Sequence, residues 1–582
     1  MRSKDISIAF ICNAVLLGLL CADALGLNLY LRALFVNLAM YVVPGTGWLG
    51  IMRRHVSSAV FLLFFQFVLS AAVLIALHLG FLAAGHVPDT HTFLVGLLVL
   101  TNAGILVSRP AAAFAMLRFD YWRIVILGVT LVCVYTCVFA GMRTLPGQLD
   151  LDGEHQGTAY GIVHEFRPYL TSDIIASPYY FAHPPLTNIF NAYSTLLLNR
   201  TEDYRYFYET AKQTERVLGL RPGGQEPVSL GPERGSLIYF QGSTYVFRTM
   251  RGNDMLDRPI SRQRVMEHLA APDQKKFFDD PRPFPARASN IFASLFVLCV
   301  LFQWITKLTN SRLLGIVAGF VYVFSPGIFI RSCFSEHVAF TNALLVVLAY
   351  QFCFPEEFRG KGRWGGLLAY VPGLIAGLIN QKIVIMVAPV LVMEVVTCLR
   401  QRGAGSWAVR LVKAAPIPAG FAAGTVLFWI YGLAIDPAAF FISHLRTHFF
   451  DRLLHLNTMF GGDYPGAGLL WYQFNHEFPP FLLSVFAVLY SLKSQRNRTV
   501  VFLTAWAVFG GVLFSVVDWK QTNHLTQLTI PLLAVLMMYI EQQPLAYKRV
   551  LKVLVGLCLL YGFWFDMQLL ADFHFYKPVS GW

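Results

Sequence analysis

Residues 147–190 read GQLDLDGEHQGTAYGIVHEFRPYLTSDIIASPYYFAHPPLTNIF, a polar segment in a chain that is otherwise almost continuously apolar. The segment follows directly on a long apolar run and carries Asp150, Asp152 and Glu154 among its first residues. Near its end, the proline pair 184–185 cannot continue an upstream helix and therefore starts a new element. An acidic cluster where a helix leaves a membrane indicates either a solvated loop or the mouth of a catalytic site.

The composition around this segment is that of a membrane protein. The chain has 582 residues, of which 56% are hydrophobic and only 14% are charged. A soluble protein of this length would carry about a quarter charged residues. The apolar residues form runs of about 18–25, the length that crosses the hydrocarbon core, and they do not alternate as the strands of a membrane β-barrel do. The sequence therefore predicts an all-α polytopic membrane protein.

The net charge of +13 fits the same class. In a soluble protein it would suggest nucleic acid, but in a membrane protein it reflects Lys and Arg in cytoplasmic loops beside anionic headgroups. We therefore expect membrane lipids and no nucleic acid as partners. The long loop 142–286 has none of the nine cysteines, so neither a disulfide framework nor a structural zinc site is expected. The basic, apolar N-terminus is interpreted as an uncleaved first helix.

Apolar length gives about fifteen candidate spans, several of them short, so we expect about 13–15 transmembrane helices. The candidates are 7–25, 33–52, 57–80, 92–108, 122–141, 288–306, 313–331, 337–354, 365–381, 383–399, 414–434, 478–492, 499–517, 528–541 and 550–568. Pro44-Gly45 should kink the second span. The predicted division is a four-helix block (1–120), a transmembrane catalytic region (121–540), and a C-terminal helix and tail (541–582).

Lysine and arginine give the orientation of these spans. The basic residues of seven loops fall on one side, the cytoplasmic side, if the N-terminus is inside. These residues are Arg53, Arg54, Arg109, Arg118, Arg123, Lys307, Arg312, Arg359, Lys361, Arg363, Arg400, Arg402, Lys493, Arg496, Arg498, Lys548 and Arg549. The loops 142–286 and 435–477 and the segment 518–527 then share the outer face. Acids, histidines and aromatics gather in these three segments, which predicts an outward-facing site in a bacterial-type inner or plasma membrane.

The loop 142–286 is too long to be a simple connection and is therefore functional or a small domain. Within it, residues 184–198 have helical spacing and several polar positions, which favours a helix lying in the membrane interface. Residues 200–285 contain the strand-like pieces SLIYF and TYVFR around glycine-rich turns. We therefore expect a mixed outer-face loop domain inserted here.

Acidic residues at two places in the chain, the 152–154 stretch and position 336, are candidates for proton transfer. Asp152 or Glu154 would act as a base toward an acceptor hydroxyl, and the alternative is a solvated loop mouth. Glu336, next to His337, follows the Ser325-Pro326 break and would be a second acid, with a helix cap or solvated turn as the alternative.

Cations on the predicted outer face suggest a phosphate. Lys382 lies between two apolar half-runs, where it either pairs with a phosphate or extends to the headgroups. The turn 518–524 and the loop 435–477 add further Lys, Arg and His. No tight ligand spacing recurs among the histidines, so a metal site is not the favoured interpretation. Cations that converge beside an acid at headgroup level suggest a lipid phosphate. Glu394, inside the tenth candidate span near its inner end, is expected to be paired structurally.

Four stretches, taken together and in order, resemble a known superfamily. They are DLDGEHQGTAYG…FAHPPLTNIF, RASNIFASLFVLCVLF…YVFSPGIFIRSCFSEHVAFTNALL, GLIAGLINQKIVIMVAPVL and FSVVDWKQTNHLTQLTIPLLAVL, and HLRTHFFDRLLHLNTMFGGDYPGAGLLWYQF resembles the outer loop before the last of them. These motifs, across about residues 122–540, are similar to the GT-C glycosyltransferases, especially protein O-mannosyltransferases and the lipid A aminoarabinose transferase. The chain departs in having Asp152-Gly153-Glu154 where the family has adjacent Asp-Glu, and Glu336 where the family has Asp.

The resemblance implies transfer of a sugar from a polyprenyl-phosphate donor to a lipid, glycan or protein acceptor on the outer face. It implies an inverting attack with Asp152, Glu154 and Glu336 as catalytic residues. The substrate-binding residues that it implies are Asp150, His155, His183, His337, Lys382, Arg452, Trp471, Tyr472, Lys520 and His524. No cofactor is required, although the acids are able to hold a divalent metal.

Three other interpretations stay open. An O-antigen polymerase or ligase also combines many spans with a large outer loop, but it would not need an acid base. A lipid-linked sugar transporter or flippase would have internal repeats and charges near the bilayer midplane, and neither is visible in the sequence. A structural assembly subunit would have no use for the outer cations.

Overall fold

The computed structural model describes most of the chain, and the structural statements below concern these residues. The described residues are 3–115, 121–144, 162, 184–198, 237–241, 244–251, 254–259, 284–334, 337–359, 365–400, 415–450, 478–494, 497–516 and 526–576.

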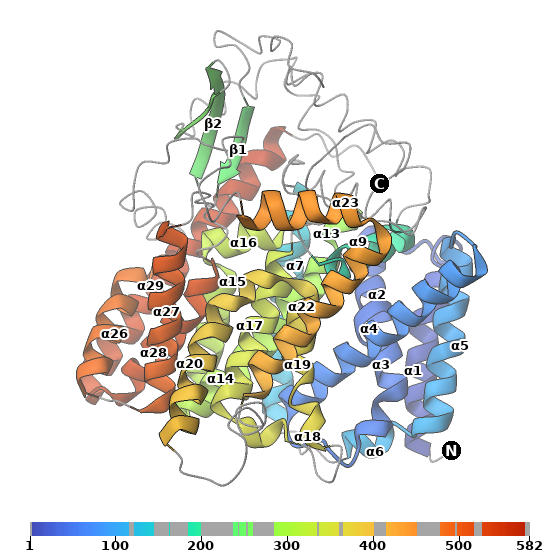
Figure 1. Cartoon of the computed structure of the whole chain (residues 1–582), viewed down its shortest axis with the longest axis horizontal. Coiled ribbons are helices and arrows are strands. Elements are labelled where there is room, and N and C mark those ends of the chain that lie inside the picture. Colours follow the sequence, from blue (N-terminus) through green and yellow to red (C-terminus); the bar gives the residue numbers. More distant parts are fainter. Residues whose placement is uncertain are drawn as a thin grey trace.

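The N-terminal helices form the blue part of Figure 1. They are α1 (Ser3–Leu20), α2 (Leu29–Tyr41), α3 (Val43–Trp48), the 3₁₀ turn η1 (Leu49–Met52), α4 (Ala59–Ala84), α5 (Thr90–Ser108) and α6 (Ala111–Phe114). The helix that begins at Leu29 stops at Tyr41, and a new one with Pro44 in its first turn begins at Val43. The helix is thus interrupted near Pro44, where the sequence predicted a kink, because proline cannot supply a backbone N–H to the preceding turn.

The remaining helices build the larger part of the bundle. They are α7 (Tyr121–Thr144), α9 (Leu186–Leu198), α13 (Phe284–Arg287), α14 (Ser289–Thr309), α15 (Arg312–Val323), α16 (Pro326–Ser332), α17 (Val338–Cys353), η3 (Pro355–Glu357), α18 (Gly365–Leu368), α19 (Val371–Ile379), η4 (Gln381–Ile383), α20 (Val384–Arg400), α22 (Pro416–Ile435), α23 (Pro437–Phe440), η5 (Phe441–Phe450), α26 (Phe481–Ser494), α27 (Arg498–Val516), α28 (Thr526–Gln542) and α29 (Leu545–Tyr576).

The prediction of an all-α polytopic membrane fold is confirmed. Within the described ranges, nine helices are long and apolar enough to cross a membrane, or ten if the bent pair α15–α16 counts as one. Four further apolar segments, including α17 and α19, are shorter than a full span. The pair α15–α16 bends by 67° at the Ser325-Pro326 break that the sequence predicted.

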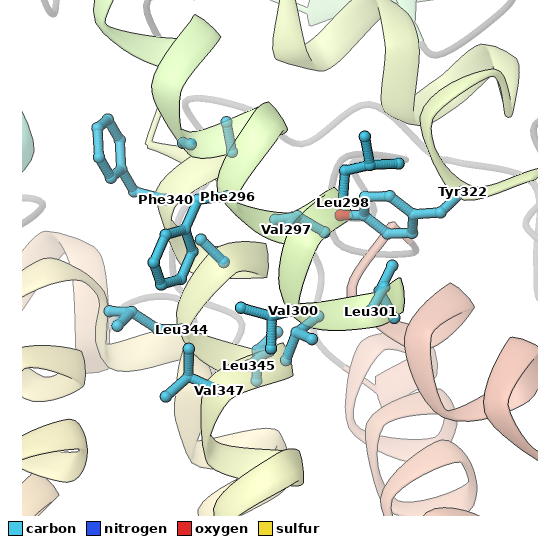
Figure 2. Packing of buried hydrophobic residues seen from close by; sticks show 14 of the residues in the cluster. Phe296, Val297, Leu298, Val300, Leu301, Tyr322, Phe340, Leu344, Leu345 and Val347 are labelled. Carbon is cyan, nitrogen blue, oxygen red and sulfur yellow. The ribbon is translucent and has the colours of Figure 1, made fainter. Parts of the chain in front are cut away.

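The centre of the bundle is the packing of α14 against α17, with Tyr322 of α15 at one side (Figure 2). Every residue of α17 from Val338 to Phe352 is buried, so this helix is surrounded by protein. A helix that is apolar on all sides is typical of such a central position. Phe296 of α14 and Phe340 of α17 belong to the same buried cluster.

The two predicted strand-like pieces form β1 (Leu237–Gln241) and β2 (Thr244–Arg251). A third strand that the sequence did not predict, β3 (Asp254–Pro259), completes a small antiparallel sheet in the order β1-β2-β3. The register pairs Tyr239 with Val246, and Arg248 with Asp257. In Figure 1 the sheet lies beyond one end of the bundle, near α13, α16 and α23, which we call the sheet end. The N-terminus, α6 and α18 lie at the opposite end.

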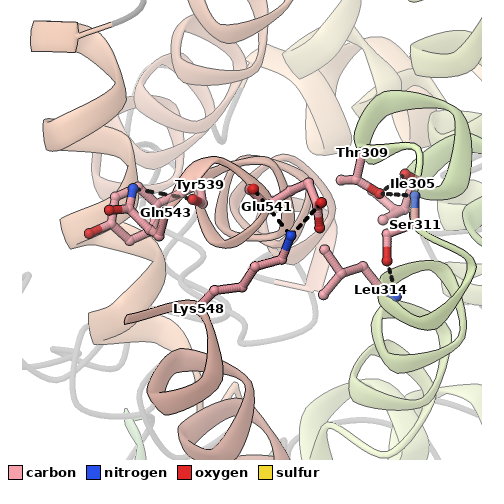
Figure 3. Close-up of polar contacts among 8 residues, drawn as sticks. All are labelled: Ile305, Thr309, Ser311, Leu314, Tyr539, Glu541, Gln543 and Lys548. Atoms are coloured by element: carbon pink, nitrogen blue, oxygen red, sulfur yellow. Dashed lines mark hydrogen bonds and ion pairs between the residues drawn. The ribbon is translucent and has the colours of Figure 1, made fainter. Parts of the chain in front are cut away.

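Ion pairs join several helix ends of the described bundle. Figure 3 shows Lys548 of α29 paired with Glu541 of α28, beside the α14–α15 turn where Ser311 Oγ accepts from Leu314 N at 3.4 Å. Glu394 of α20 pairs with Arg498 of α27, so the predicted structural pairing of this acid is confirmed.

One close helix crossing depends on glycine. In the α19–α22 pair, Gly373 and Gly377 face Gly420 and Gly424, and a Cβ at Gly424 would overlap the Leu374 carbonyl oxygen. Small residues at such crossings let two backbones approach and gain dispersion contacts where no water is available to drive association.

We expect Gly424→Ala to lower the free energy of unfolding by about 1–3 kcal/mol, because the added methyl group has no space. The measurement is thermal unfolding of the purified protein in detergent. Gly556→Ala in α29 is the matched control, since its Cβ would meet nothing within 4 Å. Equal melting temperatures for the two variants would contradict the close crossing.

Candidate functional site

Eight buried polar residues lie on or next to α9, α13, α14, α16, α17 and η4, toward the sheet end. We call this set the polar junction, and each member is at most 4% exposed. Its residues are Asn191, Arg287, Ser289, Asn290, Arg331, His337, Thr341 and Asn380. Polar and charged groups at this depth in an apolar bundle are costly unless they are hydrogen-bonded, and in membrane proteins they commonly serve function.

Arg287 is the most deeply buried charge of the polar junction, with no exposed surface. It ends α13, and its Nη1 donates to the carbonyl oxygen of Met142 at 2.9 Å. Its Cζ lies 4.8 Å from the centre of the Phe334 ring, within the range of a cation–π contact. Because Met142 is in the last turn of α7, Arg287 fixes the helix end from which the acidic segment departs.

The first turn of α14 contacts two other elements. Ser289 Oγ donates to Asn191 Oδ1 of α9, and Asn290 Nδ2 donates to the carbonyl oxygen of Phe334. Phe334 N in turn donates to the carbonyl oxygen of Arg331 at 3.4 Å. Arg287 thus contacts the Phe334 ring, and Arg331 lies one turn before Phe334 in the chain, so both arginines belong to the same part of the fold.

The structure joins the turns that carry the predicted residues His337 and Lys382. Asn380 adopts an extended conformation that ends α19, and its Oδ1 accepts from Lys382 N at 2.9 Å. Its Nδ2 donates to Thr341 Oγ1 at 2.8 Å, and Thr341 Oγ1 donates to the carbonyl oxygen of His337 at 2.9 Å. The Asn380–Thr341 bond thus joins the Lys382 turn to the first turn of α17, and the other two bonds order each of these turns locally.

The other predicted site residues lie outside the described residues. They are Asp150, Asp152, Glu154, His155, His183, Glu336, Arg452, Trp471, Tyr472, Lys520 and His524. The helices that flank the acidic segment are described: α7 ends at Thr144, α9 begins at Leu186, and both contact α13. The chain therefore leaves and re-enters the described bundle beside Arg287.

The helix predicted for 184–198 exists as α9, but its position corrects the interfacial interpretation. Twelve of its thirteen residues, from Leu186 to Leu198, are buried in protein. Asn191 and Ser194 gave this helix a polar stripe typical of a headgroup-facing surface, whereas the stripe faces the other helices. A polar stripe alone does not distinguish headgroups from a buried polar site.

Sequence reasoning did not select Arg287 and Arg331 as site residues. The pattern that could have identified Arg331 is its place in the apolar run IFIRSCF, since a charge inside such a run indicates a function. Arg287 precedes a span, a position that also fits an ordinary membrane-flanking residue. Burial separates the two interpretations. Elsewhere, no three His, Cys, Asp or Glu side chains among the described residues come together as a metal site.

No protein-family model and no curated protein matches the chain. Among solved structures, the chain is similar to ArnT from Cupriavidus metallidurans bound to undecaprenyl phosphate, with 12% identity and a TM-score of 0.44, over 75% of this chain and 64% of that chain. It is also similar to the same protein in the apo state, with 14% identity and a TM-score of 0.39, over 74% of this chain and 62% of that chain. The match spans less than two thirds of either ArnT chain.

We expect Thr341→Val to lower the free energy of unfolding by about 1–3 kcal/mol, because Asn380 Nδ2 loses its acceptor in a buried place. Thr130→Val is the matched control, since the Thr130 hydroxyl donates only to the Ile126 carbonyl of its own helix. The measurement is thermal unfolding in lipid nanodiscs. If the two variants are equally stable, the Asn380–Thr341 bond is not a structural link of the site.

Proposed function

We propose that this chain is a membrane glycosyltransferase that moves a sugar from a polyprenyl-phosphate donor to an acceptor on the outer face of the membrane. The observation that carries the proposal is the polar junction, which places two buried arginines and the Lys382 turn at the sheet end of a membrane bundle. A guanidinium presents planar paired donors that match the oxygens of a phosphate. The negative charge of the phosphate would balance the positive charge of the buried arginines.

The place of the polar junction suits a lipid-linked donor. A polyprenyl chain stays in the hydrocarbon while its phosphate lies near the headgroups, so cations at one end of the bundle match its charged part. The buried cations of the described part gather at the sheet end, in the same region as the helix ends next to the acidic segment. A flippase would instead carry its charges near the bilayer midplane.

The proposed reaction is a single displacement. Asp152 or Glu154 takes the proton of the acceptor hydroxyl, whose oxygen attacks the anomeric carbon with inversion. The bond between that carbon and the phosphate oxygen breaks, and the polyprenyl phosphate leaves with the electron pair. Positive groups stabilise the departing phosphate. The residues assigned to this role are Lys382, Arg452, Lys520 and His524.

The roles of the remaining residues follow from this scheme. Glu336 is the second acid, and His337, the next residue in the chain, is the N-cap of α17. The other assigned substrate-binding residues are Asp150, His155, His183, Trp471 and Tyr472. The scheme requires no metal, and a chelator added to the purified protein tests this part separately from the carboxylates.

Asp152→Asn and Glu154→Gln test the base. We expect the variant that removes the base to lose about 10²–10⁴-fold in kcat, because the acceptor hydroxyl keeps its proton. The measurement is sugar transfer from polyprenyl-phosphate donors by purified protein in lipid. Full transfer by both variants would show that the base is neither residue.

Lys382→Ala tests the phosphate site. We expect on the order of a tenfold weaker affinity for polyprenyl phosphate with little change in melting temperature, because a charge-assisted contact is lost from a half-buried side chain. The control is Lys493→Ala, which removes an exposed lysine from the last turn of α26. Unchanged affinity in Lys382→Ala would remove this lysine from the site.

A further inference from the structure

A side chain from the N-terminal block is hydrogen-bonded to the backbone of the α13–α14 segment. Asn37 of α2 is 5% exposed, and its Nδ2 donates to the Ala288 carbonyl oxygen at 3.0 Å. Its Oδ1 accepts from Phe292 N at 3.1 Å. One amide group therefore bonds both an acceptor and a donor of the same chain segment, about 250 residues away in sequence.

This bridge replaces a helical hydrogen bond. In a continuous α-helix, Phe292 N would donate to the Ala288 carbonyl oxygen, four residues earlier. Here Phe292 N donates to Asn37, and the Ala288 carbonyl also accepts from Ile291 N at 3.2 Å, as in a tighter 3₁₀ turn. A side chain inserted into the helical ladder is a recognised cause of a break, and α13 ends at Arg287 and α14 begins at Ser289 on either side of it.

The break lies inside the polar junction. Arg287, Ser289 and Asn290 are the residues next to Ala288, and they make the contacts to α7, α9 and the Phe334 turn described above. One turn along α2, the Tyr41 ring stacks on the Phe292 ring with centroids 4.5 Å apart. Asn37 and Tyr41 thus hold the same point of α14 from the same face of α2.

We propose that Asn37 is a positioning residue, which holds the α13–α14 break open and so places the Arg287 guanidinium against Met142 and Phe334. This role rests on the proposed function only in so far as Arg287 serves the donor phosphate. It gives the N-terminal block a role in the site, although the block contributes no residue to the polar junction. Asparagine suits the place because it offers a donor and an acceptor, whereas leucine of similar size offers neither.

The test compares Asn37→Leu with a matched variant of the same block. Asn102→Leu also removes an amide pair from between membrane helices, since Asn102 and Asn13 exchange hydrogen bonds at 2.8 and 3.1 Å. The other hydrogen bond given by Asn102 goes to Leu98 of its own helix. Both variants should lose thermal stability. Only Asn37→Leu should lose about 10²-fold in kcat for sugar transfer, because a small misplacement at the reacting centre is enough for such a loss. Equal transfer by the two variants at matched stability would overturn the positioning role.

A second readout does not depend on sugar transfer. Each leucine variant is combined with Arg287→Lys, and the melting temperatures of single and double variants are compared. The losses in melting temperature from Asn37→Leu and Arg287→Lys should sum to more than the loss in the double variant, because Asn37→Leu already displaces the guanidinium that Arg287→Lys removes. The losses from Asn102→Leu and Arg287→Lys should be additive. Additive losses in both cycles would overturn the proposal. Overlap in a protein that transfers no sugar would support the positioning of Arg287 and reject only the proposed function.

Discussion

Burial of the Arg287 guanidinium inside an apolar bundle is the constraint on which the arrangement of the sheet end depends. A cation removed from water must be surrounded by acceptors and rings, and the neighbouring elements supply them through the Met142 carbonyl and the Phe334 ring. These partners belong to α7 and to the turn between α16 and α17. Because each contact is directional, satisfying one arginine fixes the relative places of several helix ends.

The same requirement extends through the polar junction. A hydrogen bond between Asn380 and Thr341 joins η4 to α17, and one between Ser289 and Asn191 joins α14 to α9. Apolar packing specifies the relative positions of these helices less strictly, since hydrophobic side chains of similar volume replace one another at little cost. Buried hydrogen bonds remove that freedom. The bundle therefore combines an apolar centre that supplies cohesion with a polar end that supplies a defined geometry.

The sequence predicts this fold well where a local pattern has one physical cause. Apolar length predicted the spans, β-branched and aromatic pieces predicted the strands, and Pro44 and Pro326 marked two interruptions. It predicted less where the cause is tertiary. The burial of α9 and the role of Arg287 depend on which helices surround them, and a hydropathy pattern holds no such information. The sequence also did not predict the bond between Thr341 and Asn380, which joins the turn of Lys382 to the first turn of α17.

The Asn37 amide also has a consequence for the order of assembly. An isolated α14 inserted in lipid has no partner for Phe292 N other than its own Ala288 carbonyl, because lipid tails offer no acceptor. Association with α2 exchanges that one internal bond for two bonds to another helix. The break between α13 and α14 would therefore form only when α2 and α14 associate.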